Sequence, residues 1–154
     1  MTRKMALFLA TAGSAAALLG ALAFQYIGGL APCELCLWQR YPHGVAIAAG
    51  LLALMTVRGK LLPMIGGLAA LTTAGLGVYH TGVERAWWQG PTSCTGGGDV
   101  GNLSADQLLD QIMAAPVVMC DQVAWQMFGL SMASYNALAS AVLAVLWYIA
   151  WRKS

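Results

Sequence analysis

Long runs of apolar residues, rather than an alternation of apolar and polar positions, organise this chain. The first run covers residues 5–27 and contains no charged residue. As a helix it would measure about 35 Å, enough to cross a hydrocarbon core of about 30 Å. Further runs predict helices at about residues 38–57, 61–80 and 128–151. Four such segments predict an all-α membrane protein, built as a four-helix transmembrane bundle.

Two polar segments are expected to lie outside the membrane, at about residues 28–37 and 81–127. The longer one is rich in glycine in its first half. The residues Ser-Ala-Asp-Gln at 104–107 form a capping box, which predicts a short helix on the membrane surface, closed by Pro116. This loop is too short to be an independent domain. Residues 1–154 are therefore expected to form a single integral-membrane domain.

Composition agrees with a membrane location. Hydrophobic residues make up 59% of the chain and charged residues only 9%, whereas soluble domains are about 25% charged. The net charge of +2 is too small to indicate a nucleic-acid partner. A cleaved signal peptide is the alternative interpretation of the first apolar run. That run is longer than the usual signal-peptide core of about 7–15 residues, and its removal would leave three spans.

The charged residues are segregated between the two sides that four crossings create. Six basic residues lie on the side that also holds both termini: Arg3, Lys4, Arg58, Lys60, Arg152 and Lys153. Because basic residues are retained inside, this side is predicted to be cytoplasmic. All six acidic residues and all four cysteines fall on the opposite side. The chemistry of the thiols is therefore expected outside the cytoplasm.

The cysteines form two pairs of different character. Cys33 and Cys36 make a C-x-x-C motif at the expected start of the second helix, where free backbone N–H groups and the helix dipole favour a thiolate. Arg40 lies one turn beyond Cys36 on the same face, and its permanent charge favours the thiolate further. Cys94 and Cys120 lie in the long polar loop. Two exposed pairs on one side indicate a relay of disulfide exchange.

Three other interpretations compete with a relay. The C-x-x-C motif is half of a zinc site if Cys94, Cys120 or His80 completes the ligands; however, 25 residues separate the cysteines of the second pair. A loop-closing disulfide would merely hold the outer loops, stabilising the fold by about 3 kcal/mol. A conduit that carries reducing power outward needs cysteines in the membrane or on its cytoplasmic side, and the sequence has none there.

Three groups of residues carry a family resemblance: Pro32-Cys-Glu-Leu-Cys-Leu-Trp-Gln-Arg40; Tyr79-His-Thr-Gly-Val-Glu84 with Gly90, Pro91 and Cys94; and Cys120 with Trp125 and Phe128-Gly-Leu130. Together they resemble the DsbB family of bacterial disulfide-bond-forming membrane proteins, over essentially the whole chain. The resemblance implies a quinone-dependent oxidoreductase of the bacterial inner membrane, with its cysteines in the periplasm. Its partners would be a periplasmic DsbA-like thiol oxidase, membrane lipid and the quinone pool.

The resemblance also implies a role for each cysteine. Cys94 is the sulfur that the reduced DsbA-like partner attacks, and Cys120 is then released and exchanges with Cys33. Cys36 is left as the thiolate that faces the quinone. Arg40 binds a quinone carbonyl and stabilises the negative charge that grows on its oxygen. Because a DsbA-type oxidant has a potential of about −120 mV, ubiquinone is favoured over menaquinone, which has a lower potential.

The remaining polar residues have less specific roles. His80 matches the family's histidine near the outer end of the third helix, where it either reaches the quinone or serves as a hydrogen-bonded structural residue. His43 is a weaker candidate for the quinone site. Glu84 is expected to pair with Arg85, with proton transfer as the alternative. The tryptophans are predicted to form interfacial belts, with Trp38, Trp87, Trp88 and Trp125 at the outer face and Trp147 and Trp151 at the inner face.

Overall fold

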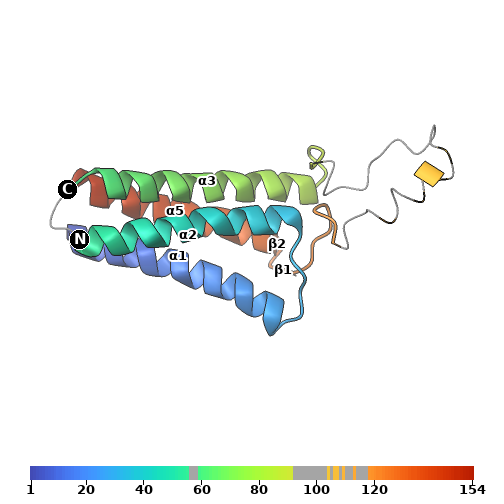
Figure 1. The fold of residues 1–154 in the computed structure, drawn as a ribbon, viewed down its shortest axis with the longest axis horizontal. Coiled ribbons are helices and arrows are strands. Elements are labelled where there is room, and N and C mark those ends of the chain that lie inside the picture. Colours follow the sequence, from blue (N-terminus) through green and yellow to red (C-terminus); the bar gives the residue numbers. More distant parts are fainter. Residues whose placement is uncertain (56–58, 92–103, 105, 108, 110–112, 114–117) are drawn as a thin grey trace.

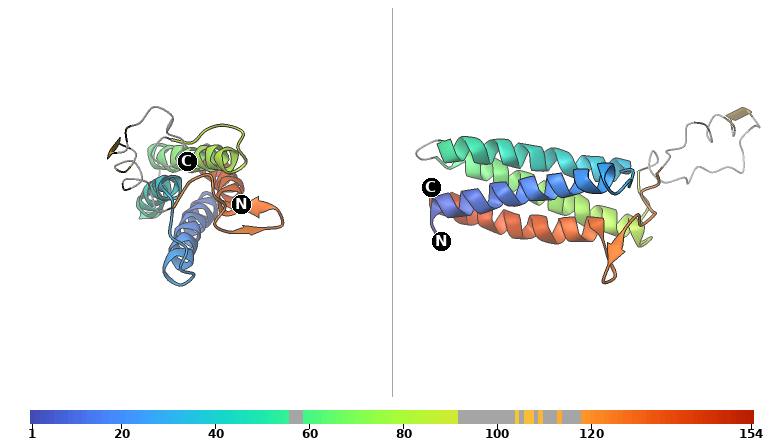
Figure 2. Two further views of the ribbon diagram at one scale, coloured as in Figure 1. Left: turned by 90° about the vertical axis from the view of Figure 1, so that its right-hand side faces the viewer. Right: turned by 90° about the horizontal axis from the view of Figure 1, so that it is seen from below.

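The computed structural model describes residues 1–55, 59–91, 104, 106–107, 109, 113 and 118–154. Within them lie four long helices: α1 (Arg3–Tyr26), α2 (Glu34–Met55), α3 (Leu61–Glu84) and α5 (Met132–Arg152). The helices run side by side along the long axis of the molecule (Figure 1), and Figure 2 shows the same bundle end-on and from below. The predicted all-helical membrane bundle is confirmed.

Three of the helices, α1, α3 and α5, are long and apolar enough to cross a membrane. Helix α2 is as long, at 22 residues, but it does not qualify within the described part of the chain. The reason lies in its first half, which carries Gln39, Arg40 and His43. Gln39 and His43 are buried inside the bundle. The predicted span at 38–57 is thus present as a helix, but its outer half presents polar groups to the interior.

A short hairpin replaces the predicted start of the last span. Strands β1 (Gln126–Met127) and β2 (Leu130–Ser131) pair antiparallel across Phe128 and Gly129. These two residues have φ angles of 51° and 75°, as a two-residue type I′ turn requires. The prediction of a helix from residue 128 was therefore wrong by four residues, because the Phe-Gly pair forms a turn. Ser131 then begins α5 by accepting a hydrogen bond from the Ser134 amide.

The capping box at residues 104–107 is confirmed. The Ser104 amide donates to Gln107 Oε1 at 3.0 Å, and the Gln107 amide donates to Ser104 Oγ at 3.4 Å. Most of the predicted surface helix, and Cys94, lie outside the described residues.

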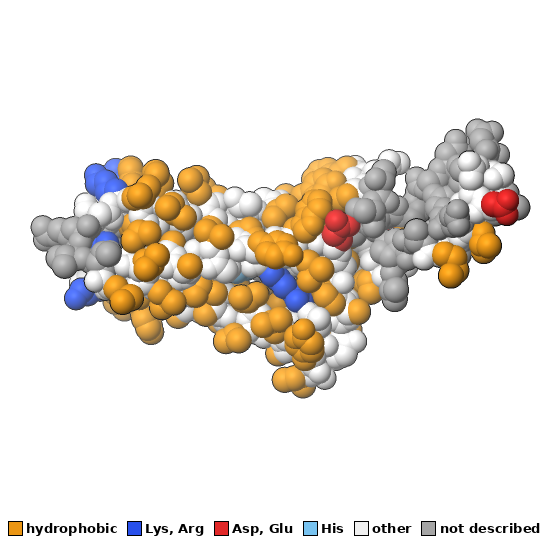
Figure 3. Space-filling view, in the orientation of Figure 1, with side chains coloured by type: hydrophobic (Ala, Val, Ile, Leu, Met, Phe, Trp, Pro, Cys, Tyr) orange, Lys and Arg blue, Asp and Glu red, His pale blue; other side chains and the backbone are white. Residues whose placement is uncertain are grey.

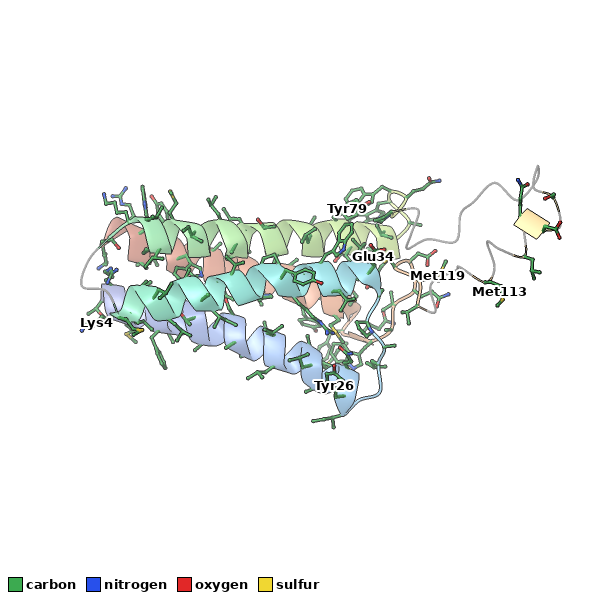
Figure 4. All side chains as sticks on the ribbon, in the orientation of Figure 1. Lys4, Tyr26, Glu34, Tyr79, Met113 and Met119 are labelled. Atoms are coloured by element: carbon green, nitrogen blue, oxygen red, sulfur yellow. The ribbon has the colours of Figure 1, made fainter. Side chains whose placement is uncertain are left out.

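The terminus end, where α1 begins and α5 ends, is tightly closed. Arg3 Nε donates to Ser154 Oγ at 3.0 Å, so the two ends of the chain are in contact. Basic side chains gather at this end (Figure 3), where Lys4 is labelled in Figure 4. The core between the helices consists mainly of small residues around one large ring: Ala6, Leu7, Ala10, Ala46, Ala53, Ala69, Ala70, Leu143, Trp147 and Ala150.

Trp147 fills the centre of this closed end. Its exposed fraction is 0%, and a Cβ atom added to Gly66 would lie 2.6 Å from its ring. The predicted inner belt was therefore wrong for Trp147, because the missing side chain at Gly66 leaves room for the indole inside the bundle. Trp151 does lie at the surface of this end, 5.5 Å from Lys60 Nζ.

The cavity end, opposite the termini, is more open. Helix α1 runs beside α2 near the termini and diverges from it toward Tyr26 (Figures 1 and 4). Tyr26, Glu34 and Tyr79, which belong to three different helices, all lie at this end in Figure 4. The divergence of α1 leaves space that the loops after α1 and before β1 partly cover.

Candidate active site

A cavity of about 270 Å³ lies where α1 diverges from the other helices. All four helices contribute to its wall, together with residues 30–33 and 118–125. Most of the lining side chains are apolar, and the cavity also receives a small group of polar and thiol side chains: Cys33, Cys36, Gln39, Arg40, His43, His80, Glu84, Gln122 and Asn136. An apolar cavity with a few convergent polar groups is the usual form of a small-molecule site.

The C-x-x-C pair forms one side of this cavity. Cys33 directly precedes α2, and Cys36 lies in its first turn. Both are free thiols, with 3.0 Å between their Sγ atoms. The Cys36 amide also donates to Cys33 Sγ at 3.3 Å, as the start of a helix allows. The sulfurs are therefore close enough to form a disulfide after a shift of about 1 Å.

The hydrogen bond between the two sulfurs separates their acidities. It raises the pKa of the Cys33 thiol, and burial raises it further. The same hydrogen bond, against the effect of burial, lowers the pKa of Cys36 to about 7. Cys36 precedes the predicted span at 38–57, and the Arg40 charge also lowers its pKa, while Glu84 opposes this. Cys36 is therefore the sulfur that carries the thiolate near neutral pH.

Arg40 is held against the cavity wall by α1. Its Nη1 donates to Gln25 Oε1 at 2.6 Å, and its Nη2 donates to the Ala21 carbonyl at 3.5 Å. Arg40 Nε is buried and has no hydrogen-bond partner among the described residues. A buried N–H donor without a partner is costly, so this position favours a ligand that brings an acceptor oxygen.

His80 lies beside the thiol pair from α3. Its side chain is buried, and its Nε2 is 3.5 Å from Cys33 Sγ and 3.9 Å from Glu84 Oε1. Glu84 lies one helical turn after His80 on α3 and faces its side chain. Arg85, the expected partner of Glu84, instead donates from Nη2 to the Gly129 carbonyl at 3.0 Å. The Glu84 carboxylate therefore lies beside His80, and it also forms a hydrogen bond with the Ser131 side chain.

A polar network that was not predicted from the sequence lies behind His80. Gln39 Nε2 lies 2.9 Å from His80 Nδ1, and Asn136 Nδ2 donates to Gln39 Oε1 at 2.8 Å. Asn136 also contacts Thr73 and His43, at 3.1 Å and 2.9 Å. The available signal was an amide residue within an apolar span, because polar residues inside a membrane usually have a specific role.

Three aromatic residues form another part of the wall. The Trp125 ring lies 5.3 Å from Phe24 and 6.0 Å from Tyr135, measured between ring centroids. All three line the cavity. Trp125, predicted as part of the outer belt, thus belongs to the cavity wall, where a flat ring could stack against it.

Of the second cysteine pair, only Cys120 lies among the described residues. Cys120 is disulfide-bonded and fully buried, and it belongs to the same buried cluster as Cys33, Leu35 and Val83. Cys94 lies outside the described residues, so its pairing with Cys120 stays a prediction. The structure therefore brings a disulfide-bonded cysteine and a free dithiol into one cluster.

Three of the candidate zinc ligands lie close together in the structure. Donor atoms of Cys33, Cys36 and His80 all lie within 4.8 Å of one another. Cys120 is unavailable as a fourth ligand while it is in a disulfide. The three residues can thus serve either redox exchange or metal binding. Which of the two they favour depends on which ring nitrogen of His80 carries the proton.

Comparison with known proteins agrees with the chemistry of these thiols. A family model for "Disulfide bond formation protein DsbB" matches residues 3–150. The chain is 31% identical to disulfide bond formation protein B of Verminephrobacter eiseniae, over 94% of this chain and 84% of that protein. It is 32% identical to the Pasteurella multocida protein of the same name, over 94% of this chain and 83% of that protein. No solved structure matches the chain. The chain belongs to the DsbB family of disulfide bond formation proteins.

Proposed function

We propose that this protein is a membrane thiol:quinone oxidoreductase that reoxidises a periplasmic DsbA-like thiol oxidase. Electrons would enter through the Cys94–Cys120 pair, pass to Cys33 and Cys36, and leave to a membrane quinone. Family membership supports disulfide formation in a membrane. The finer claim depends on one observation: Cys36 and the Arg40 side chain line the same apolar cavity.

The cavity fits the ring of a quinone. Its volume of about 270 Å³ lies just below the roughly 300–1,000 Å³ of small-molecule sites. Aromatic side chains supply flat apolar surface, and Arg40 Nε supplies a buried donor that an oxygen acceptor would satisfy. A bound quinone would supply the acceptor for two electrons and two protons. Arg40, Trp125 and Phe24 are the residues proposed to hold it.

The protein's own residues would carry out the thiol chemistry. A thiolate of the partner attacks Cys94, and Cys120 leaves as a thiolate. Cys120 then attacks Cys33, which forms a Cys120–Cys33 disulfide, breaks the Cys33–Cys36 disulfide and leaves the charge on Cys36. The second thiolate of the partner displaces Cys94, which closes the partner's disulfide, and Cys94 then attacks Cys120, which restores the Cys94–Cys120 disulfide and releases Cys33. Each exchange conserves one disulfide, so the oxidation of one partner dithiol delivers two electrons to the Cys33–Cys36 pair. Arg40 stabilises negative charge at the cavity wall throughout.

The charge distribution supports a matching orientation. Lys4, Lys60 and Arg152 lie at the terminus end, and the thiol pair lies at the start of α2, at the opposite end. With the basic end in the cytoplasm, the cavity end would face the periplasm of a bacterial inner membrane. Ubiquinone is the proposed acceptor, because its potential exceeds that of menaquinone.

The test is quinone reduction by purified full-length protein, with a reduced DsbA-type protein as donor. Ubiquinone should be reduced in step with donor oxidation, and Cys36→Ser should abolish turnover while remaining folded. Menaquinone in place of ubiquinone tests the choice of acceptor. Absence of turnover with both quinones, in protein shown to be folded, would overturn the proposal and favour disulfides that only stabilise the loops.

A further inference from the structure

The orientation of the Gln39 amide is fixed by its surroundings. Gln39 Nε2 lies 3.0 Å from the Leu35 carbonyl, which can only accept a hydrogen bond. The side-chain nitrogen must therefore face Leu35, and the oxygen must face Asn136. Gln39 Nε2 is also the atom that lies 2.9 Å from His80 Nδ1. Gln39 is thus a donor toward His80.

A second set of contacts fixes the same orientation from the opposite side. Thr73 Oγ1 donates to the Gln39 backbone carbonyl at 3.1 Å, so its oxygen is left to accept from Asn136 Nδ2. Asn136 Nδ2 therefore donates to Gln39 Oε1 at 2.8 Å, and Asn136 Oδ1 accepts from His43 Nε2 at 2.9 Å. The backbone carbonyls of Leu35 and Gln39, both on α2, can only accept hydrogen bonds. Together they give one consistent set of donors and acceptors for this network.

The order of donors and acceptors in this network continues from Gln39 through His80 to the thiols. Because His80 Nδ1 accepts from Gln39, the proton of the neutral ring lies on Nε2. That N–H faces Cys33 Sγ at 3.5 Å, and the His80 ring also hydrogen-bonds to the Cys120 backbone. Cys33 Sγ also accepts from the Cys36 amide, and it lies 3.0 Å from Cys36 Sγ, toward which its own proton is directed. One series of donors thus runs from Gln39 through His80 and Cys33 to the Cys36 sulfur.

We propose that Gln39 is a positioning residue: it holds the His80 proton on Nε2 and so sets a donor chain from Gln39 through His80 and Cys33 that ends at the Cys36 sulfur. This inference deepens the proposed function, on which it rests. In this arrangement His80 cannot take the Cys33 proton, because its Nε2 already carries one. The proton of the reduced pair stays on Cys33, and the negative charge stays on the sulfur that lines the cavity with Arg40.

The same arrangement opposes metal binding by the reduced pair. A histidine that binds a metal through Nε2 needs a proton on Nδ1, usually donated to a carboxylate or carbonyl. Gln39 presents a donor there instead. The charged and titratable groups around Cys36 are Arg40 on α2, His80 and Glu84 on α3, and Cys33. A metal would have to reverse the Gln39 amide and break its bond to Leu35.

The test uses the two histidines of the chain as probes. Reduced full-length protein, labelled with ¹⁵N in the imidazole rings, should give only two ring systems, and His43→Gln assigns them. In the wild type, His80 should show a protonated Nε2 and an unprotonated Nδ1. In Gln39→Glu the carboxylate can only accept, so Nδ1 of His80 should become protonated. Gln122→Glu makes the same change in the same cavity and should leave the His80 resonances as in the wild type.

Chemical reactivity gives a second readout. Cys36 should be alkylated faster than Cys33 in the reduced wild type, and Gln39→Glu should reduce the ratio of the two rates by about tenfold or more. Gln39→Glu, unlike the wild type, should also bind Zn²⁺ when titrated with the metal alone.

An Nδ1 proton on wild-type His80, or a His80 spectrum unchanged in Gln39→Glu, would overturn the inference. Neither readout requires a quinone or a protein partner. A failure of quinone turnover with the expected histidine spectra would therefore reject the proposed function alone.

Discussion

The two ends of this bundle are built from the same four helices but are packed in opposite ways. At the terminus end, alanines and one buried indole fill the space between helices, and α1 lies close to its neighbours. At the cavity end, α1 diverges and the interior holds two thiols, a guanidinium and a network of amides and imidazoles. The closed end holds the helices together, and the open end can therefore keep polar groups beside an unfilled space.

The contrast shows how a short membrane protein supports reactive groups in an apolar setting. Buried polar groups are costly unless they are hydrogen-bonded, and several at the cavity end share one hydrogen-bond network. Gln39 alone contacts Leu35, His80 and Asn136. The exceptions at this end, among the described residues, are Arg40 Nε, His43 Nδ1 and Glu84 Oε2, and all three residues line the cavity.

The largest effect is expected from removing the guanidinium at the cavity end. Arg40→Ala should reduce quinone reduction by about 10²–10³-fold, because a preorganised donor to developing negative charge is lost. Single-turnover exchange with the reduced donor protein, measured without quinone, should change little. Arg85→Ala makes the same change outside the cavity and should retain quinone reduction. Equal losses in both assays of Arg40→Ala would remove its assigned role.

The closed end should respond in stability rather than in chemistry. Gly66→Leu should lower the free energy of unfolding by about 1–3 kcal/mol, because a side chain there collides with Trp147. A Cβ atom added at Gly75, on the same helix, meets no atom within 4 Å, so Gly75→Leu serves as the matched control. Denaturation in detergent measures both. If Gly75→Leu is destabilised as much as Gly66→Leu, the packing around Trp147 does not hold the closed end together.

A smaller, graded effect is expected from pH at the open end. The pKa of Cys36 is lowered to about 7, so its thiolate is present above this pH and is lost as the pH falls through it. Alkylation of Cys36 in the reduced protein should be nearly constant above about pH 8 and should fall about tenfold for each pH unit below about 6. A midpoint at the ordinary thiol value would show that Cys33 does not stabilise the Cys36 thiolate.

Much of the architecture could be predicted from the sequence, because a membrane constrains it strongly. Long apolar runs predicted the helices, and the spacing of Arg40 from Cys36 predicted that both would face one site. The boundaries were less predictable. Phe128 is an apolar residue that the pattern assigned to a helix, yet its positive φ places it in a turn.

The parts of the site that escaped prediction depend on contacts between helices. The pairing of Gln39 with His80 and Asn136 joins residues 41 and 97 positions apart. No local pattern encodes such contacts, because each residue alone is only a polar side chain in an apolar run. Trp147 was misassigned for the same reason, since its burial depends on the absence of a side chain at Gly66, on another helix.

The most direct measurement is a single turnover without any protein partner. Fully reduced protein would be mixed under anaerobic conditions with one equivalent of ubiquinone, and the disulfides formed would be mapped by mass spectrometry while ubiquinol is followed optically. We predict one ubiquinol for each Cys33–Cys36 disulfide, and no ubiquinol from Cys36→Ser. Unreacted ubiquinone, or a first disulfide that does not involve Cys36, would contradict the proposal that the open end couples this dithiol to the quinone.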